Sequence, residues 1–259
     1  MIVSHGDSAI TPHVLILGGT TEASALARVV AEHRLAAVFS YAGRVARPRP
    51  QPLPTRVGGF GGVDGLTEYL RAEAITHVVD ATHPFAAGMS RNAITACARI
   101  GVPLVALTRP AWQRQQGDLW TSVAGIDDAV AALDRPATRV MLALGRMHLA
   151  AFAVRPQHHY LLRLVDPADH LPLPDCSVVI DRGPFTVSGD KALLLDHRIE
   201  LVVSKNSGGD GARSKIDAAR DLGLPVLMID RPAIPDRDEV ATSQEVLAWL
   251  GHSGVNLGV

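Results

Sequence analysis

Cysteine is scarce in this sequence, and its scarcity excludes a disulfide framework. Among 259 residues there are only two cysteines, Cys97 and Cys176, and they lie far apart in the chain. They are too few for a cysteine-based metal site or for a small fold held together by disulfides. The histidines show no metal-ligand spacing with carboxylates or cysteines. We therefore predict no metal.

Excess charge of one sign and long apolar runs are also missing. The formal net charge is −1, whereas a protein that binds nucleic acid normally carries a strongly basic domain. No apolar run approaches the roughly 20 residues that span a bilayer, and the first residues lack a charged and then apolar signal pattern. We expect a soluble, cytoplasmic protein without nucleic-acid or membrane partners, and a loose tail over residues 1–12.

What the sequence does contain is a regular alternation of short apolar strands with segments that suit helices. Such alternation is typical of βαβ units and parallel sheets. The pattern runs once, ends in a helix near 126–133, and then starts again, which indicates two α/β sheets. The expected strands are 14–17, 36–41, 55–57, 77–81, 103–107, 120–123, 139–144, 160–165, 177–180, 200–204 and 225–229, with a closing helix near 243–250.

Internal repeats support two copies of one fold. The ten residues 101–110 align with the ten residues 223–232 without a gap, from a Gly-x-Pro start through an apolar run to an Arg-Pro end. A Gly-x-Pro start alone is common before strands, because it ends the preceding helix. Further glycines recur at matched intervals in the same order, which favours duplication. We place the boundary near 134–138, where a proline ends the helix, and expect domains at 13–135 and 136–259.

The first strand leads into a glycine turn. Gly18 and Gly19 allow a tight turn, and Thr20 or Thr21 can cap a helix that continues through Glu22. A helix N-terminus after such a turn is a place where phosphates bind. The spacing differs from the dinucleotide fingerprint G-x-G-x-x-G. Phosphate binding and an ordinary strand–helix connection both remain open from these residues alone.

The two halves differ in the residues at the ends of their strands. In parallel sheets, ligands bind beyond the carboxyl ends of the strands. In the first half these positions are rich in glycine and threonine. In the second half they carry cations: Arg146, Arg163, Arg182 and Lys205. Guanidinium groups bind carboxylates through paired hydrogen bonds. The sequence thus predicts a nucleotide in the first half and an anionic ligand in the second.

Arg44 indicates which nucleotide is bound. It comes after the second strand, where dinucleotide folds place an acid for a ribose hydroxyl or an arginine for a 2′-phosphate. No Asp or Glu occupies 36–47, so we predict the phosphorylated cofactor. Arg47 and Arg49 fit better as solvated residues of the proline-rich loop 48–54.

Five motifs of the chain resemble those of the precorrin-6A reductases of cobalamin (vitamin B12) biosynthesis. They are Leu17-Gly18-Gly19-Thr20-Thr21-Glu22-Ala23, Tyr41-Ala42-Gly43-Arg44, Gly58-Gly59-Phe60-Gly61, Asp80-Ala81-Thr82-His83-Pro84-Phe85-Ala86 and Ser204-Lys205-Asn206-Ser207-Gly208-Gly209. The last two are far more specific than the glycine turn. The resemblance covers about 13–250.

The resemblance implies a fold and a reaction. It implies two Rossmann-like domains, NADPH in one, and a tetrapyrrole with many carboxylates facing the other. The family reduces one double bond of the macrocycle by hydride transfer with a matching protonation, which turns precorrin-6A into precorrin-6B. In the family the last strands of the two sheets can be exchanged between domains; the candidates here are 120–123 and 239–241. A hand-over of product to the next pathway enzyme is left open.

The resemblance also suggests roles for individual residues. Cofactor contacts are expected from Gly18, Gly19, Thr20, Thr21, Glu22, Arg44, Gly59 and Thr82. Substrate carboxylates are expected at Arg146, Arg163, Arg182, Asn206, Ser207, Arg213 and Lys215. His83 and Lys205 are the candidate proton donors. Alternatively, His83 only caps a helix, Lys205 only binds a carboxylate, and water protonates the product. Arg109 and Arg231 occupy equivalent repeat positions and suit a structural role as well as a ligand contact.

Other functions stay open from the sequence. The substrate can be the metal-free or the cobalt-bound macrocycle. A non-catalytic two-domain protein that binds nucleotides or anions would need neither Arg44 nor a nicotinamide. Two-domain glycosyltransferases also clamp a nucleotide between such domains, but their halves are usually longer than the ~120–130 residues available here.

Overall fold

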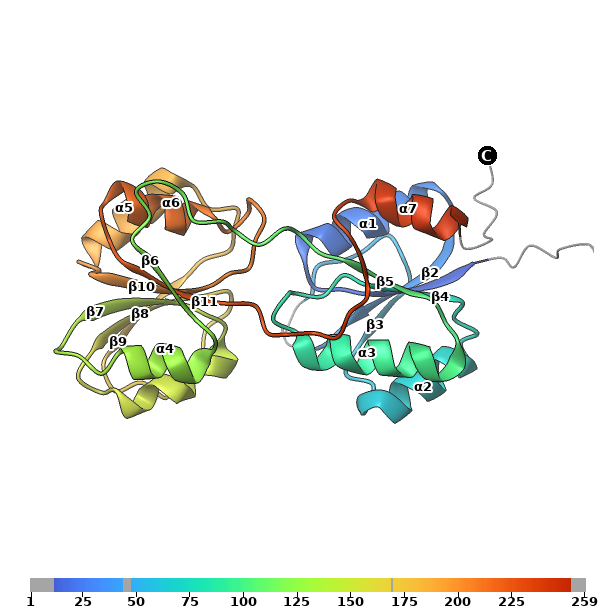
Figure 1. The fold of residues 1–259 in the computed structure, drawn as a ribbon, viewed down its shortest axis with the longest axis horizontal. Helices are drawn as coiled ribbons and strands as arrows, with labels where there is room; N and C mark the ends of the chain where they lie inside the picture. The colour runs from blue at the N-terminus through green and yellow to red at the C-terminus, as the bar shows by residue number, and fades with distance from the viewer. Residues whose placement is uncertain (1–11, 44–47, 169, 253–259) are drawn as a thin grey trace, which may run out of the picture. The chain divides into compact units, whose positions relative to one another are not determined.

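The computed structural model describes residues 12–43, 48–168 and 170–252. Arg44, Arg47 and nearly all of the expected tail lie outside the described residues. The chain forms two compact units (Figure 1). Unit 1 runs to Arg109 and resumes at Ala233, and unit 2 is Pro110–Pro232.

Unit 1 is built on a parallel six-stranded sheet in the order β12-β5-β4-β1-β2-β3. Helices α1 and α7 pack on one face and α2 and α3 on the other (Figure 1). The elements are β1 His13–Leu17, α1 Thr21–Glu32, β2 Ala36–Tyr41, β3 Thr55–Val57, α2 Gly62–Ala72, β4 His77–Asp80, α3 Ala87–Ile100, β5 Leu104–Leu107, β12 Asp238–Val240 and α7 Ser243–His252.

Unit 2 repeats this plan with the order β6-β11-β10-β7-β8-β9, again all parallel. Helices α5 and α6 pack together on one face, and α4 and the 3₁₀ segment η1 pack together on the other (Figure 1). The elements are β6 Trp120–Val123, α4 Ile126–Ala132, β7 Arg139–Ala143, η1 Arg146–Val154, β8 His159–Leu164, β9 Cys176–Ile180, α5 Val187–Asp196, β10 Leu201–Lys205, α6 Ser214–Asp221 and β11 Val226–Ile229.

Helices on both faces explain the apolar runs in the sequence. A strand covered on both sides has no polar face, so its residues are apolar throughout. Val14–Leu17 of β1 illustrate this, since none of the four is more than 1% exposed. The α/β class expected from the alternation is confirmed.

The two units exchange a strand. β6 comes after β5 in the chain but pairs with β11 of unit 2, and β12 comes after unit 2 but pairs with β5. The exchange suggested by the family resemblance is therefore present. The expected boundary near 134–138 differs from the structure, because Pro136 lies within the connection between α4 and β7, inside unit 2. The chain crosses between units at Arg109–Pro110 and Pro232–Ala233, where the matched repeat segments end.

Each crossing is fixed by the arginine that stands at or just before it. Arg109 Nη1 donates to Glu22 Oε2 at 2.7 Å in unit 1. Arg231 donates from Nε to the carbonyl of Asn206 and from Nη2 to that of Ser207, both at 3.1 Å, in unit 2. Both contacts favour the structural role for this repeated pair.

His77, at the start of β4, gives the fold a sensitivity to acid. It is 4% exposed, its ring packs edge-on against Trp249, and its buried Nε2 has no hydrogen-bond partner among the described residues. Burial lowers the pKa of His77 below its ordinary value. The unfolded chain therefore binds a proton at about pH 6.5 that the folded chain rejects, so stability is lost as the pH falls below that value.

We predict that His77→Phe reduces this loss, because phenylalanine keeps the ring contact and cannot be protonated. The measurement is the free energy of unfolding in urea at pH 7.5 and at pH 5.0 for both proteins. The variant should show the smaller difference between the two pH values. An equal or larger difference in the variant would contradict this assignment.

Candidate functional site

A cavity of about 220 Å³ lies in unit 1, where β1, β2, β3 and β4 end. Its lining consists mainly of small side chains from the loops after these strands and from α3: Gly18, Gly19, Tyr41, Ala42, Gly43, Pro48, Val57, Thr82, His83, Ala86 and Met89. The structure thus brings four predicted site residues together, Gly18 and Gly19 after β1 and Thr82 and His83 after β4. This is the edge at which parallel sheets bind ligands.

The two glycines after β1 are required for different reasons, Gly18 for lack of space and Gly19 for its backbone conformation. A Cβ on Gly18 would lie 2.1 Å from the Phe39 ring, so only glycine fits between this turn and β2. Gly19 has φ +128°, a conformation that L side chains rarely adopt, and the space beside it is open. The turn thus presents bare backbone to the cavity.

Thr20 fixes the turn from within. Its Oγ1 accepts from the N–H of Ala23, which makes it the N-cap of α1, and donates to the carbonyl of Ala81 at 2.9 Å. It thereby joins the loops after β1 and β4, and its hydroxyl both donates and accepts hydrogen bonds within the protein. Glu22, expected at the cofactor, has its carboxylate paired with Arg109. The first N–H groups of α1 remain the anion-binding feature of this turn.

Arg56 on β3 organises the glycine loop that contains Gly59, and the sequence did not single it out. Its Nη1 donates to Ser40 Oγ at 2.9 Å and to the carbonyl of Gly58 at 3.0 Å, while Nη2 donates to that of Gly59 at 3.1 Å. The guanidinium also stacks 3.8 Å from the Phe60 ring centre. A lone arginine before two glycines and an aromatic residue was the available signal.

The loop after β4 is held by Asp80. Its Oδ1 accepts from the N–H of Thr82 at 3.2 Å and from the Thr82 hydroxyl at 2.7 Å. His83 accepts from the N–H of Phe85 through Nδ1 at 3.2 Å. Helix α3 begins at Ala87, after a turn closed by the Ala86 N–H donating to the His83 carbonyl.

In unit 2, Arg163 is buried rather than displayed. It forms an ion pair with Asp190, and their side chains are 10% and 2% exposed. Its guanidinium stacks 3.8 Å from the Phe185 ring centre, and Ser214 Oγ also donates to Asp190. The positive charge of Arg163, which the sequence places at this strand end, is therefore paired with the Asp190 carboxylate inside unit 2.

Four further predicted residues make contacts within unit 2, and two of them, Asn206 and Lys215, contact Trp112 in the segment where the chain enters it. The Asn206 side chain bonds the backbone of Trp112 reciprocally, accepting at 2.8 Å and donating at 3.0 Å. The buried Lys215 donates to the Ala212 carbonyl and lies 4.9 Å from the Trp112 ring centre. The Ser207 carbonyl accepts a hydrogen bond from Arg231. Arg213 donates a hydrogen bond to Asp217 of α6.

The remaining cations lie where the strands of unit 2 end. Arg146 donates to the Pro167 carbonyl at 3.2 Å, and Arg182 lies 3.7 Å from Asp166 in the same loop. Exposed apolar side chains accompany them: Met147 is 67%, Ile180 47% and Val165 45% exposed. We call Arg146, Met147, Val165, Ile180, Arg182 and Lys205 the unit 2 rim.

Lys205 at the end of β10 is paired with His148, which the sequence did not single out. The Lys205 Nζ lies 2.8 Å from His148 Nε2. A lysine ammonium has only donors, so the imidazole accepts through Nε2. Only the fold brings these two together, because they lie on β10 and η1.

Comparison with known proteins identifies the family. The family model described as precorrin-6x reductase CbiJ/CobK matches residues 13–251, nearly the whole chain. The chain belongs to this precorrin-6x reductase family. It is 58% identical to the precorrin-6A reductase of Rhodobacter capsulatus over 242 residues, which cover 93% of this chain and 96% of that one. It is 30% identical over 250 residues to the cobalt-precorrin-6A reductase of Priestia megaterium, covering 92% and 97%.

The solved structure described as CobK precorrin-6A reductase has the same fold. It superposes with a TM-score of 0.91 at 57% identity, covering 95% of this chain and 99% of that one. The arrangement of two parallel six-stranded sheets is therefore that of the precorrin-6x reductase family.

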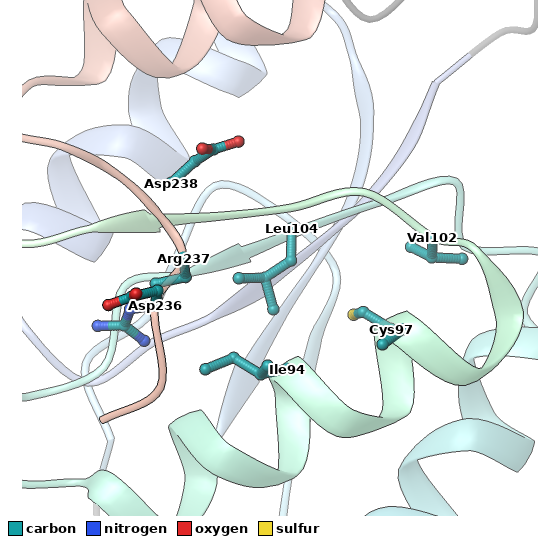
Figure 2. A pocket seen from close by; sticks show the side chains of 8 residues that line it. Ile94, Cys97, Val102, Leu104, Asp236, Arg237 and Asp238 are labelled. Atoms are coloured by element: carbon teal, nitrogen blue, oxygen red, sulfur yellow. The ribbon is translucent and has the colours of Figure 1, made fainter. Parts of the chain in front are cut away.

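This family member has a second, more open groove in unit 1, about 520 Å³ in volume (Figure 2). Apolar side chains of α3 and β5 line it opposite Asp236, on the segment that leads into β12, and Asp238, the first residue of β12. Cys97 of α3 is one of its lining residues, and burial raises the pKa of that thiol to about 12, which disfavours the reactive thiolate. The groove shares no lining residue with the first cavity.

The described part of the chain offers no metal centre and no membrane anchor of the helical kind. No group of three or more His, Cys, Asp or Glu side chains there is placed to hold a metal ion. None of the described helices combines the length and apolar character needed to cross a membrane.

Proposed function

We propose that this protein is the precorrin-6A reductase of a cobalamin pathway, an oxidoreductase that reduces one double bond of the precorrin-6A macrocycle with NADPH. The observation that carries the proposal is full-length similarity, at 58% identity, to a relative of that name. Relatives named precorrin-6A reductase are 43–58% identical, whereas those named cobalt-precorrin-6A reductase are 29–30% identical. The metal-free macrocycle is therefore the favoured substrate.

The cavity of unit 1 fits a dinucleotide. Bare backbone at Gly18 and Gly19 and the first turn of α1 suit a pyrophosphate. Thr82 and His83 line the same cavity and would lie toward the nicotinamide. When bound, NADPH supplies the hydride, and the residues of the cavity position it and exclude water. Arg44 would bind the 2′-phosphate; it lies outside the described residues, next to Gly43 of the cavity lining.

We predict that NADPH raises the unfolding temperature far more than NADH, and that Arg44→Ala removes the difference. The reason is that the 2′-phosphate distinguishes the two cofactors and an arginine binds it through paired hydrogen bonds. Thermal unfolding with saturating NADPH, NADH or neither makes the comparison. The matched control is Arg49→Ala, because Arg49 is an exposed arginine of the same loop. Equal stabilisation by both cofactors would contradict the role of Arg44.

The unit 2 rim is the proposed substrate surface. A tetrapyrrole is a broad apolar ring that bears carboxylates at its periphery. The rim offers this ligand both exposed apolar side chains and cations. Arg163, Asn206, Arg213 and Lys215 would support the rim from within unit 2, because their contacts are internal to that unit.

Lys205 is the proposed proton donor. Its Nζ lies 2.8 Å from His148 Nε2, and this contact fixes the position of the amino group at the end of β10. Donation of a proton from this group to the carbon next to the one that receives the hydride would complete the reduction. His83, with Nδ1 occupied by the Phe85 N–H, would instead shape the cofactor cavity.

A further inference from the structure

Asp80 is a buried carboxylate that has other hydrogen-bond partners besides Thr82. It ends β4, and its Oδ2 accepts from Ser90 Oγ of α3 at 2.6 Å and from Arg237 Nη1. The side chains of Asp80 and Arg237 are 1% and 8% exposed. Each oxygen thus has a separate task, with Oδ1 on Thr82 and Oδ2 on Ser90 and Arg237.

Arg237 reaches this site from a distant part of the sequence. It stands on the segment that leads into the exchanged strand β12, opposite α3 (Figure 2). Its Nε also bonds the Glu239 carboxylate at 3.2 Å. The chain must therefore complete unit 2 and return to unit 1 before Asp80 gains its cation.

We propose that Arg237 is a positioning residue for the cofactor cavity and acts through Asp80 on Thr82. A carboxylate buried to this degree stays charged only with a cation beside it. Without Arg237, no cation offsets the buried charge of Asp80, and the side chain turns toward water. Oδ1 then no longer accepts two hydrogen bonds from Thr82, and the loop that lines the cavity loosens. The proposal rests on the assignment of this cavity to NADPH.

Unit 2 supplies a matched control. Asp190 pairs with Arg163 and accepts from Ser214 Oγ, as Asp80 pairs with Arg237 and accepts from Ser90. Both pairs are buried arginine–carboxylate pairs supported by a serine. The difference is that Asp80 also holds a residue of the cofactor cavity. Loss of either arginine should destabilise its unit, but only loss of Arg237 should change cofactor binding.

The test compares Arg237→Gln with Arg163→Gln in the full-length protein. We expect Arg237→Gln to raise the NADPH Kd about tenfold, and Arg163→Gln to change it less than about twofold while also lowering the unfolding temperature. The double variant Asp80→Asn/Arg237→Gln leaves no unpaired charge and should recover part of the lost affinity. If Arg237→Gln lowers the unfolding temperature but leaves the NADPH Kd unchanged, Arg237 is only structural and the proposal is overturned.

Two further readouts keep the proposal testable. If Arg237→Gln does not fold, Arg237→Lys retains the charge and should show a smaller rise in Kd; an unchanged Kd would count against the proposal. Hydrogen exchange at the Thr82 amide should accelerate in Arg237→Gln and not in Arg163→Gln. This exchange requires no cofactor. A wild-type protein that fails to bind NADPH would therefore refute the cofactor assignment, while the Thr82 exchange still decides the positioning role.

Discussion

A chain that ends after Pro232 is expected to leave unit 1 unfolded while unit 2 keeps its structure. Unit 1 would lack β12 and α7, and with them Arg237 and the core residues Val246 and Leu250, both fully buried. Burial of those two side chains alone stabilises by ~3–6 kcal/mol, a large share of the ~5–15 kcal/mol that holds a typical domain together. Unit 2 lies wholly within Pro110–Pro232 and retains all six strands.

Hydrogen exchange of the truncated chain makes the comparison. Amides of β1 and β4 should exchange freely, and those of β7 and β10 should stay protected. Residues 1–135 expressed alone should likewise fail to fold, because β6 would have no partner and unit 1 would still lack β12. A stably folded fragment 1–135 would contradict the strand exchange.

Lys205→Met is expected to lower kcat/KM for the tetrapyrrole by about 10²–10⁴. Methionine has a similar length but cannot donate a proton or bind a carboxylate. Initial rates read from the absorption of the macrocycle measure the effect, and a separate titration measures NADPH affinity, which should change little. The matched control is Lys191→Met, since Lys191 is a partly exposed lysine of α5 that pairs with Asp221 away from the rim.

Two outcomes of this experiment would count against the assignment. Loss of NADPH binding in Lys205→Met would mean that the cofactor and substrate halves are interchanged. Equal rates for Lys205→Met and the wild-type protein would remove Lys205 from both catalysis and substrate binding.

The order of the elements could be read from the sequence because its signals are local. An apolar run such as Val14–Leu17 with two glycines after it needs nothing distant to be recognised as a strand and a turn. The exchange could not be derived in this way. β6 and β12 are short, and none of their residues is buried. Their own residues therefore carry no information about which sheet they join.

In the candidate site, too, the residues with local signals were predictable and those that depend on distant partners were not. Gly18, Gly19, Thr82 and His83 were found because turn residues reveal their positions locally, and all four line one cavity. The cations of unit 2 were harder to interpret, because a charge at a strand end does not show whether a carboxylate such as Asp190 meets it from another element. His148 and Arg237 were missed because their partners come from other elements. Arg56 was missed although its local signal, an arginine before two glycines and an aromatic residue, was present.

The most direct test of NADPH-dependent reduction is a single turnover with NADPH that carries deuterium at the hydride position. The product is analysed by mass spectrometry, with the metal-free and the cobalt-bound macrocycle tested side by side. We expect one deuterium in each molecule of reduced metal-free product, with one NADPH oxidised for each macrocycle consumed, and little product from NADH. A reduced product without deuterium, or turnover of the cobalt form alone, would contradict the proposed reaction.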